Sequence, residues 1–224
     1  MISTRILAIS IPCAVLSVAL LCAEDLSSYR EFQFGIDLPA VAKQAGTKPS
    51  EVTVVHLRPA MIEELAWQPQ RLRGPSGETD PVAEVIFGFY DGELFRIVVN
   101  YDRYKTEGLT AEDMVEAISA KYGTAARPAA EITLHYNERE KVIARWEDSQ
   151  YSFNLVRSSY GLTFAMVVFS KRLDALAQAA IVEAIRLDKQ EAPQREIERQ
   201  KKQDEEIRAG HEKARLVNKP GFRP

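Results

Sequence analysis

The sequence predicts an α+β fold in which about six to eight strands form an antiparallel sheet with helices packed on one face. A strand, an Asp-Gly turn and a second strand fill residues 82–101, and short β-branched segments fill residues 131–169. A capped helical segment comes before each of these runs of strands, and a third helix follows. This order indicates two possible units, each made of one helix and one meander.

The first 23 residues are predicted to be a cleavable export signal. Arg5 supplies a positive start, an uncharged run follows from Ile6 to Leu21, and the small residue Ala23 precedes the acidic Glu24. We therefore expect an exported protein, located in the periplasm or outside the cell. The expected domains are 1–23 (signal peptide), 24–190 (α+β domain) and 191–224 (charged tail).

Two alternatives to simple cleavage stay open. The uncharged run approaches the length that crosses a bilayer, so an uncleaved segment would anchor the protein in a membrane. This segment would then be the expected membrane contact. Lipidation of Cys22 normally requires a small residue before the cysteine, and Leu21 stands there instead, which disfavours a lipoprotein.

Composition excludes several classes of protein. The hydrophobic share of 46% and the charged share of 27% are those of an ordinary globular domain. Both cysteines, Cys13 and Cys22, lie in the predicted signal, so the mature chain should have neither a disulfide nor thiol chemistry. Without Arg5 the 29 Lys and Arg become 28 against 32 acidic residues, a net charge of −4, which disfavours nucleic acid as a partner.

The first half of the domain should contain a short helix followed by strands. Asp37 suits the N-cap, Pro39 the first turn and Gly46 the end of a helix. Residues 51–58 are rich in β-branched side chains and lie between two prolines, as expected of a strand. Residues 60–67 fit either a helix or a strand, and the loop that follows to residue 81 is rich in Gly, Pro and Arg.

The clearest local signal is the hairpin in which Asp91-Gly92 joins strands 82–90 and 93–101. A two-residue turn pairs Tyr90 with Glu93 and, if the register continues unbroken, puts Arg96 beside Phe87. We expect the stem of Arg96 to cover apolar surface while its head reaches the rim. Both faces of the hairpin are largely apolar, which predicts central strands that are covered on both sides.

The second half repeats this order. A helix should begin at Thr110 and end at Gly123, because threonine can cap it and glycine can stop it. A third helix should begin after Ser170, and Pro193 should mark the end of its packed part. Beyond it the apolar residues are too sparse for a coiled coil, so the tail should be a solvated helix or disordered. The expected strands are 131–136, 141–147, 151–157 and 162–169.

No catalytic, cofactor-binding or metal-binding residue is predicted, and no cofactor is expected. The histidines His56, His135 and His211 are too few and too scattered for a zinc motif, and Arg215 stands where a second ligand would be needed after His211. Residues 74–77 have the wrong spacing for a nucleophile elbow. Glycine-rich phosphate-binding loops are also missing from the sequence.

An alternative function is that of a carboxylate-based hydrolase. Such an enzyme would need two carboxylates on either side of a scissile bond. The candidate carboxylates are Glu63, Glu64, Asp102, Glu147 and Asp148. Sequence alone does not bring them together, and adjacent acids are more often part of a solvated face or a turn.

Arginine and tryptophan dominate many binding interfaces when both are exposed, and two such groups occur here. Arg71 and Arg73 follow Trp67, and Arg145 precedes Trp146. The alternative is that both tryptophans lie in the core and the arginines are solvated.

Three short motifs resemble those of uncharacterised exported bacterial proteins. They are Phe34 to Val41, Asp91-Gly92-Glu93-Leu94 and Lys121-Tyr122-Gly123. The architecture is similar to the small α+β modules of β-lactamase inhibitor proteins and outer-membrane assembly lipoproteins. This resemblance implies a non-enzymatic binding or scaffold protein of the cell envelope, whose partner would be another envelope protein.

Overall fold

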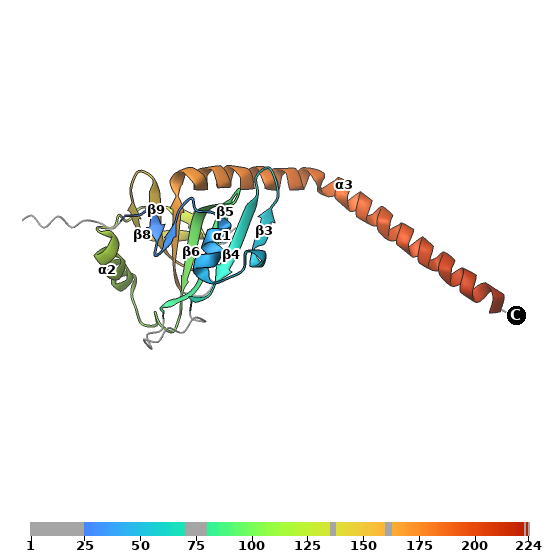
Figure 1. Cartoon of the computed structure of the whole chain (residues 1–224), viewed down its shortest axis with the longest axis horizontal. Helices are drawn as coiled ribbons and strands as arrows, with labels where there is room; N and C mark the ends of the chain where they lie inside the picture. The colour runs from blue at the N-terminus through green and yellow to red at the C-terminus, as the bar shows by residue number, and fades with distance from the viewer. Residues whose placement is uncertain (1–24, 70–79, 135–137, 160–162, 222, 224) are drawn as a thin grey trace, which may run out of the picture.

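An eight-stranded antiparallel sheet forms the centre of the computed structural model and confirms the predicted α+β class (Figure 1). The structure describes residues 25–69, 80–134, 138–159, 163–221 and 223. Within these ranges the strands are β1 (Ser28–Tyr29), β2 (Phe32–Gln33), β3 (Thr53–His56), β4 (Ile62–Trp67), β5 (Val82–Tyr90), β6 (Glu93–Tyr101), β7 (Glu131–Thr133), β8 (Arg139–Glu147), β9 (Tyr151–Arg157) and β10 (Phe164–Ser170). The helices are α1 (Leu38–Ala45), α2 (Ala111–Tyr122) and α3 (Lys171–Asn218), with 3-10 turns at Pro49–Glu51 and Lys219–Gly221.

The sheet consists of two units of the same topology. Its strand order is β3-β4-β5-β6-β10-β9-β8-β7, so each unit is one helix followed by a four-stranded meander. The last strand of each meander lies at the centre, where β6 and β10 pair antiparallel with Val98 opposite Val167. The arrangement of two helix-plus-meander units that the sequence suggested is therefore present.

Helices cover both faces of this sheet rather than one. Val41 of α1 and Ile118 of α2 belong to the main core, together with Phe87 and other residues of the central strands. On the opposite face, Leu173 and Ala177 of α3 pack against Ile62 and Phe95. The reason is already visible in the hairpin, whose two faces are both apolar, so that burying both of them stabilises the fold.

The N-terminal hairpin β1–β2 completes the main core and was not predicted from the sequence. Phe32 is fully buried, with its ring 4.5 Å from that of Phe87 and 5.4 Å from that of Trp67. Arg30 donates hydrogen bonds of 2.7 and 2.9 Å to the two carboxylate oxygens of Asp80. This ion pair fastens the hairpin to the segment that leads into β5.

The predicted caps of α1 and α2 are present. The Asp37 carboxylate accepts a hydrogen bond of 2.9 Å from the Ala40 amide, and Gly46 ends α1 with φ of 66°. Thr110 and Asp113 form a reciprocal capping box at the start of α2. Ser170 occupies the N-cap position of α3 without a capping hydrogen bond from its side chain.

The predicted register of the β5–β6 hairpin is correct at the turn and then shifts by one residue. Asp91 and Gly92 have φ of 47° and 83°, and Tyr90 pairs with Glu93 as expected. A bulge then makes Arg96, rather than Phe95, the partner of Gly88. A Cβ on Gly88 would lie 3.2 Å from the Phe95 ring, so glycine at position 88 lets this ring lie against the strand.

Several boundaries differ from expectation, including those of β8 and β10, each by about two residues at the start. The ambiguous segment 60–67 is a strand, β4, because its buried side chains lie in a sheet with β5. The predicted strand 51–58 begins instead as a 3-10 turn and continues as the shorter β3. Of the strand expected at 131–136, β7 covers Glu131–Thr133 and Leu134 follows it outside the strand, while residues 135–137 lie outside the described residues.

Candidate functional site

The most distinctive surface is the part of α3 that extends beyond the sheet. Leu173, Ala177, Ala180 and Ala184 are buried, but every residue from Ala192 to Gly221 is exposed. We call residues 192–221 the arm and residues 24–191 the body. At about 1.5 Å per residue, the helical part of the arm extends roughly 40 Å away from the body (Figure 1).

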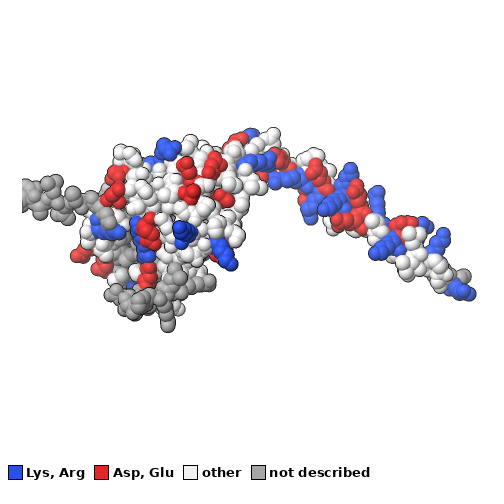
Figure 2. All heavy atoms as spheres, in the orientation of Figure 1, with Lys and Arg blue, Asp and Glu red and all other residues white. Residues whose placement is uncertain are grey.

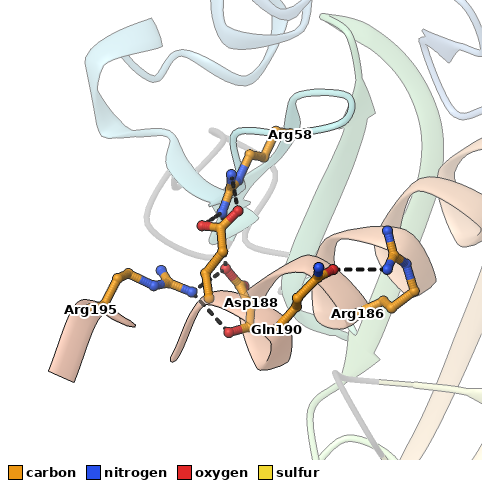
Figure 3. Close-up of polar contacts among 6 residues, drawn as sticks. Arg58, Arg186, Asp188, Gln190 and Arg195 are labelled. Carbon is orange, nitrogen blue, oxygen red and sulfur yellow. Dashed lines mark hydrogen bonds and ion pairs between the residues drawn. The ribbon is translucent and has the colours of Figure 1, made fainter. Parts of the chain in front are cut away.

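A cluster of ion pairs fastens the base of the arm to the sheet (Figure 3). Arg58, in the turn between β3 and β4, donates hydrogen bonds of 2.8 and 2.5 Å to the two carboxylate oxygens of Glu191. The Asp188 carboxylate lies 3.8 Å from the same guanidinium. The hydrogen bonds from Arg58 lower the pKa of Glu191 below its usual value. We call this group, Arg58 with Asp188 and Glu191, the clip.

The helix continues through Pro193, two residues beyond the clip. Proline has no N–H to donate to the carbonyl four residues earlier, and its ring crowds that carbonyl, so it bends a helix. Figure 1 shows α3 bending where it leaves the body. Across the bend, the Arg195 guanidinium donates to both the carboxylate of Asp188, at 2.8 Å, and its backbone carbonyl, at 3.1 Å.

Charged side chains one helical turn apart stabilise the arm. Arg199 pairs with Glu196 and Arg215 pairs with Glu212, each at 2.7 Å. Such pairs one turn apart favour the helix weakly, and salt screens them because they are exposed. The arm is mostly polar, with only Ile197, Ile207, Leu216 and Val217 as exposed large apolar side chains, so it has no continuous apolar face.

A small crevice lies between α3, the sheet and the segment after β7. It has a volume of about 100 Å³, and Arg96, His56 and Glu64 are among the residues that line it. The Arg96 guanidinium lies 3.6 Å from the Asp174 carboxylate and donates to the backbone carbonyl of Thr133. Burial lowers the pKa of Arg96, and burial raises the pKa of Asp174.

The expectation that the head of Arg96 reaches the rim is wrong, because its side chain is only 11% exposed. The bulge in β6 explains this difference. It puts both Phe95 and Arg96 on the α3 side of the sheet, whereas an unbroken register would have put Arg96 beside Phe87 in the main core. In this position Arg96 connects β6 to the first turn of α3.

The carboxylates considered for hydrolysis do not converge. Asp102 accepts hydrogen bonds from the amides of Tyr104 and Lys105, and Asp148 accepts them from the amides of Gln150 and Tyr151. Both are therefore turn residues.

The remaining carboxylates also lie apart. Glu147 pairs with Ser152, Ser152 with Phe169 and Phe169 with Arg96, so Glu147 lies at the same height in the sheet as Arg96, near the start of β6. Asp102 follows the opposite end of β6. About 20 Å along the strand direction separates these two levels. Glu64 lies level with Glu147 but five strands away, and Glu63 is buried on β4.

Both tryptophans lie in the core, which confirms that part of the alternative to an exposed binding site. Trp67 is 8% exposed and packs on Phe87. Trp146 is 2% exposed, and its indole N–H donates to the Gly123 carbonyl at 2.9 Å. Arg145 donates to the buried Asn154 at 2.7 Å instead of joining an exposed pair with Trp146.

Several predicted positions lie outside the described residues, namely Arg71, Arg73, residues 74–77, His135 and the signal segment with its two cysteines. Of the other histidines, His56 lines the crevice and His211 lies on the exposed arm. The described part of the chain holds no group of three or more metal-ligating side chains.

Sequence reasoning missed the clip altogether. Arg58 and Glu191 are 133 residues apart, and neither belongs to a recognisable motif. A weak signal existed in the acidic residues that precede Pro193, but nothing in the sequence points from them to Arg58. Only the fold, which lays α3 across the β3–β4 end of the sheet, brings the two together.

Comparisons with known proteins identify no relative of this chain. No protein-family model matches this sequence, and neither the curated proteins nor the solved structures give a significant match. Among the described residues, none of the helices is both long and apolar enough to cross a membrane. The fold and the surface define an α+β domain whose last helix is packed on the sheet in its first part and exposed to solvent beyond the clip.

Proposed function

We propose that this protein is an exported, non-enzymatic binding or scaffold protein in which the arm is the contact surface. The observation that carries the proposal is the continuous exposure of residues 192–221 in a helix whose base is fixed to the body. An exposed helix of this length contributes nothing to the core of its own domain. Contacts with a partner would offset the conformational entropy that is lost when these residues are ordered in a helix.

The body has less exposed surface that is left without a role in the fold. Helices cover both faces of the central strands, and both tryptophans are buried. The carboxylates that a hydrolase would use lie apart, so no observation favours the enzymatic alternative over binding. In line with the expected export, the proposed partner is another protein of the cell envelope.

The proposal is tested with a chain that ends at Ala192. This variant keeps Glu191 and therefore the clip, and it removes no residue of the buried core. We expect its thermal unfolding midpoint to match that of the full chain. A photocrosslinker placed at Arg208 of the full chain should give an adduct in envelope fractions, and purified partner should bind the full chain but not the variant.

Two outcomes would contradict the proposal. Recovery of uncrosslinked monomer alone would show that the arm has no partner in the envelope. Equal binding of the partner by the full chain and by the chain that ends at Ala192 would move the contact surface to the body.

A further inference from the structure

Charge is distributed unevenly between the body, the arm and its end. The body has 19 Lys and Arg against 26 Asp and Glu, a net charge of −7. Residues 192–206 have four basic and five acidic residues, a net charge of −1. We call residues 207–221 the tip, and it has four basic residues against one acid, a net charge of +3, to which Arg223 adds one more.

The tip also exposes adjacent apolar side chains. Leu216 is 62% exposed and Val217 is 71% exposed, at the last turn of α3. Lys213 and Lys219 stand three residues before and after Leu216, which makes them its neighbours on the helix surface. Figure 2 shows mixed charges along the middle of the arm and Lys and Arg atoms at its end.

These features suit a flat anionic surface better than a protein groove. A helix that binds a groove needs apolar residues aligned along one face over several turns. Ile207 and Leu216 are nine residues apart and so point to opposite sides of the helix. At an anionic bilayer, basic residues are attracted to the headgroups, and a short apolar pair between them adds a contact with the acyl boundary.

The length of the arm keeps the acidic body away from any anionic surface that the basic tip contacts. An anionic surface attracts the tip and repels the acidic body. At physiological ionic strength this repulsion decays over about 8 Å, and the arm extends roughly 40 Å, so the body would stand several screening lengths away. The tip can therefore approach such a surface without bringing the body to it.

We propose that the tip binds an anionic phospholipid surface through Lys213, Lys219 and the exposed Leu216–Val217 pair. This inference rests on the proposed function, since it takes the arm to be the contact element. It adds the chemistry of one binding surface, which is a layer of phosphate headgroups with accessible acyl chains beneath them.

The test is cosedimentation with vesicles of phosphatidylcholine, with or without phosphatidylglycerol. The chain without residues 1–23 is used, because the uncharged run 6–21 would bind vesicles by itself. We expect binding to the vesicles that contain phosphatidylglycerol, little binding to phosphatidylcholine alone, and loss of binding at high salt.

Matched variants locate the contact. Lys213→Gln with Lys219→Gln should weaken binding roughly 30-fold, since each lysine near an anionic surface strengthens binding about fivefold. The control Lys201→Gln with Lys202→Gln removes the same charge in the middle of the arm and should bind nearly as the parent chain does. Leu216→Ser with Val217→Ser keeps every charge and should also weaken binding.

Two results would overturn the inference: failure of the parent chain to sediment with phosphatidylglycerol vesicles, or equal binding by the tip and control variants. If vesicles do not bind but the Lys213 and Lys219 variant loses a crosslinked protein, the tip recognises an acidic protein instead. In that case the lipid inference fails while the proposed binding function stands. Vesicle binding without any crosslinked protein would support the lipid surface and contradict the envelope-protein partner.

Discussion

The two parts of α3 are the same helix in two environments. In the body, Leu173 and Ala177 are buried against the sheet, and Asp174 lies beside the buried Arg96. In the arm, exposed ion pairs such as Arg199 with Glu196 are the main contacts. Burial therefore fixes the first part to the fold, whereas the second part depends on helix propensity, charge pairs and the clip.

The largest effect should come from the buried leucine of α3. Leu173→Ala removes packing from a side chain that is 4% exposed and should lower the free energy of unfolding by about 3 kcal/mol. Leu216→Ala, at a site 62% exposed in the arm, should change it by less than about 0.5 kcal/mol. Urea unfolding of both variants checks this, and equal losses would contradict the division of α3 into two environments.

A smaller effect on the free energy of unfolding is expected from the partly buried ion pair between Arg30 and Asp80 in the body. Burial alone would raise the pKa of Asp80, but hydrogen bonds from Arg30 and from the Val82 amide outweigh it and lower the pKa below the usual 3.8. The stabilisation is therefore present above pH 3.8 and is lost as the pH falls through the lower folded pKa.

The variant Asp80→Asn should thus be less stable than the parent chain at neutral pH, by about 1 kcal/mol. This difference should shrink below about pH 4, as measured by urea unfolding across a pH series. As an arm control, Glu196→Gln removes an exposed pair and should leave the global free energy of unfolding unchanged at every pH. A constant Asp80→Asn difference down to the most acidic pH would show that the charge of Asp80 is not the cause.

The smallest global effect should come from the glycine inside the arm. Gly210→Ala adds a Cβ that meets nothing within 4 Å apart from the neighbouring residues and backbone of its own helix, and it should favour the local helix by about 1 kcal/mol. We expect stronger amide protection in the arm by hydrogen exchange and an unchanged unfolding midpoint for the body. A raised midpoint would mean that the arm and the body unfold as one cooperative unit.

Local signals in the sequence predicted much of this fold. Asp37, Gly46 and the Thr110 box each act through atoms a few residues away, so their roles can be inferred without the tertiary structure. The Asp91-Gly92 turn likewise identified the central hairpin. The bulge beyond it was not predictable, because it depends on the Phe95 ring packing over Gly88.

The candidate site was predictable only in part. The charge of the arm follows from its composition, which left a solvated helix and a disordered tail both open, and Pro193 indicated where the packed part ends. The clip and the buried Arg96 depend on long-range contacts, Arg58 with Glu191 and Arg96 with Asp174, for which a single sequence carries no signal. The bulge also puts Arg96 on the α3 side of the sheet, whereas an unbroken register would have put it on the side of the main core.

The bend at Pro193 has a mechanical consequence. Because the clip holds the helix just before the bend, the arm acts as a lever whose pivot lies beside the sheet. With an arm of roughly 40 Å, a change of about 10° at the pivot would displace the far end by roughly 7 Å. A small rearrangement of Arg58, Asp188 and Arg195 would thus be converted into a displacement comparable to more than one turn of helix.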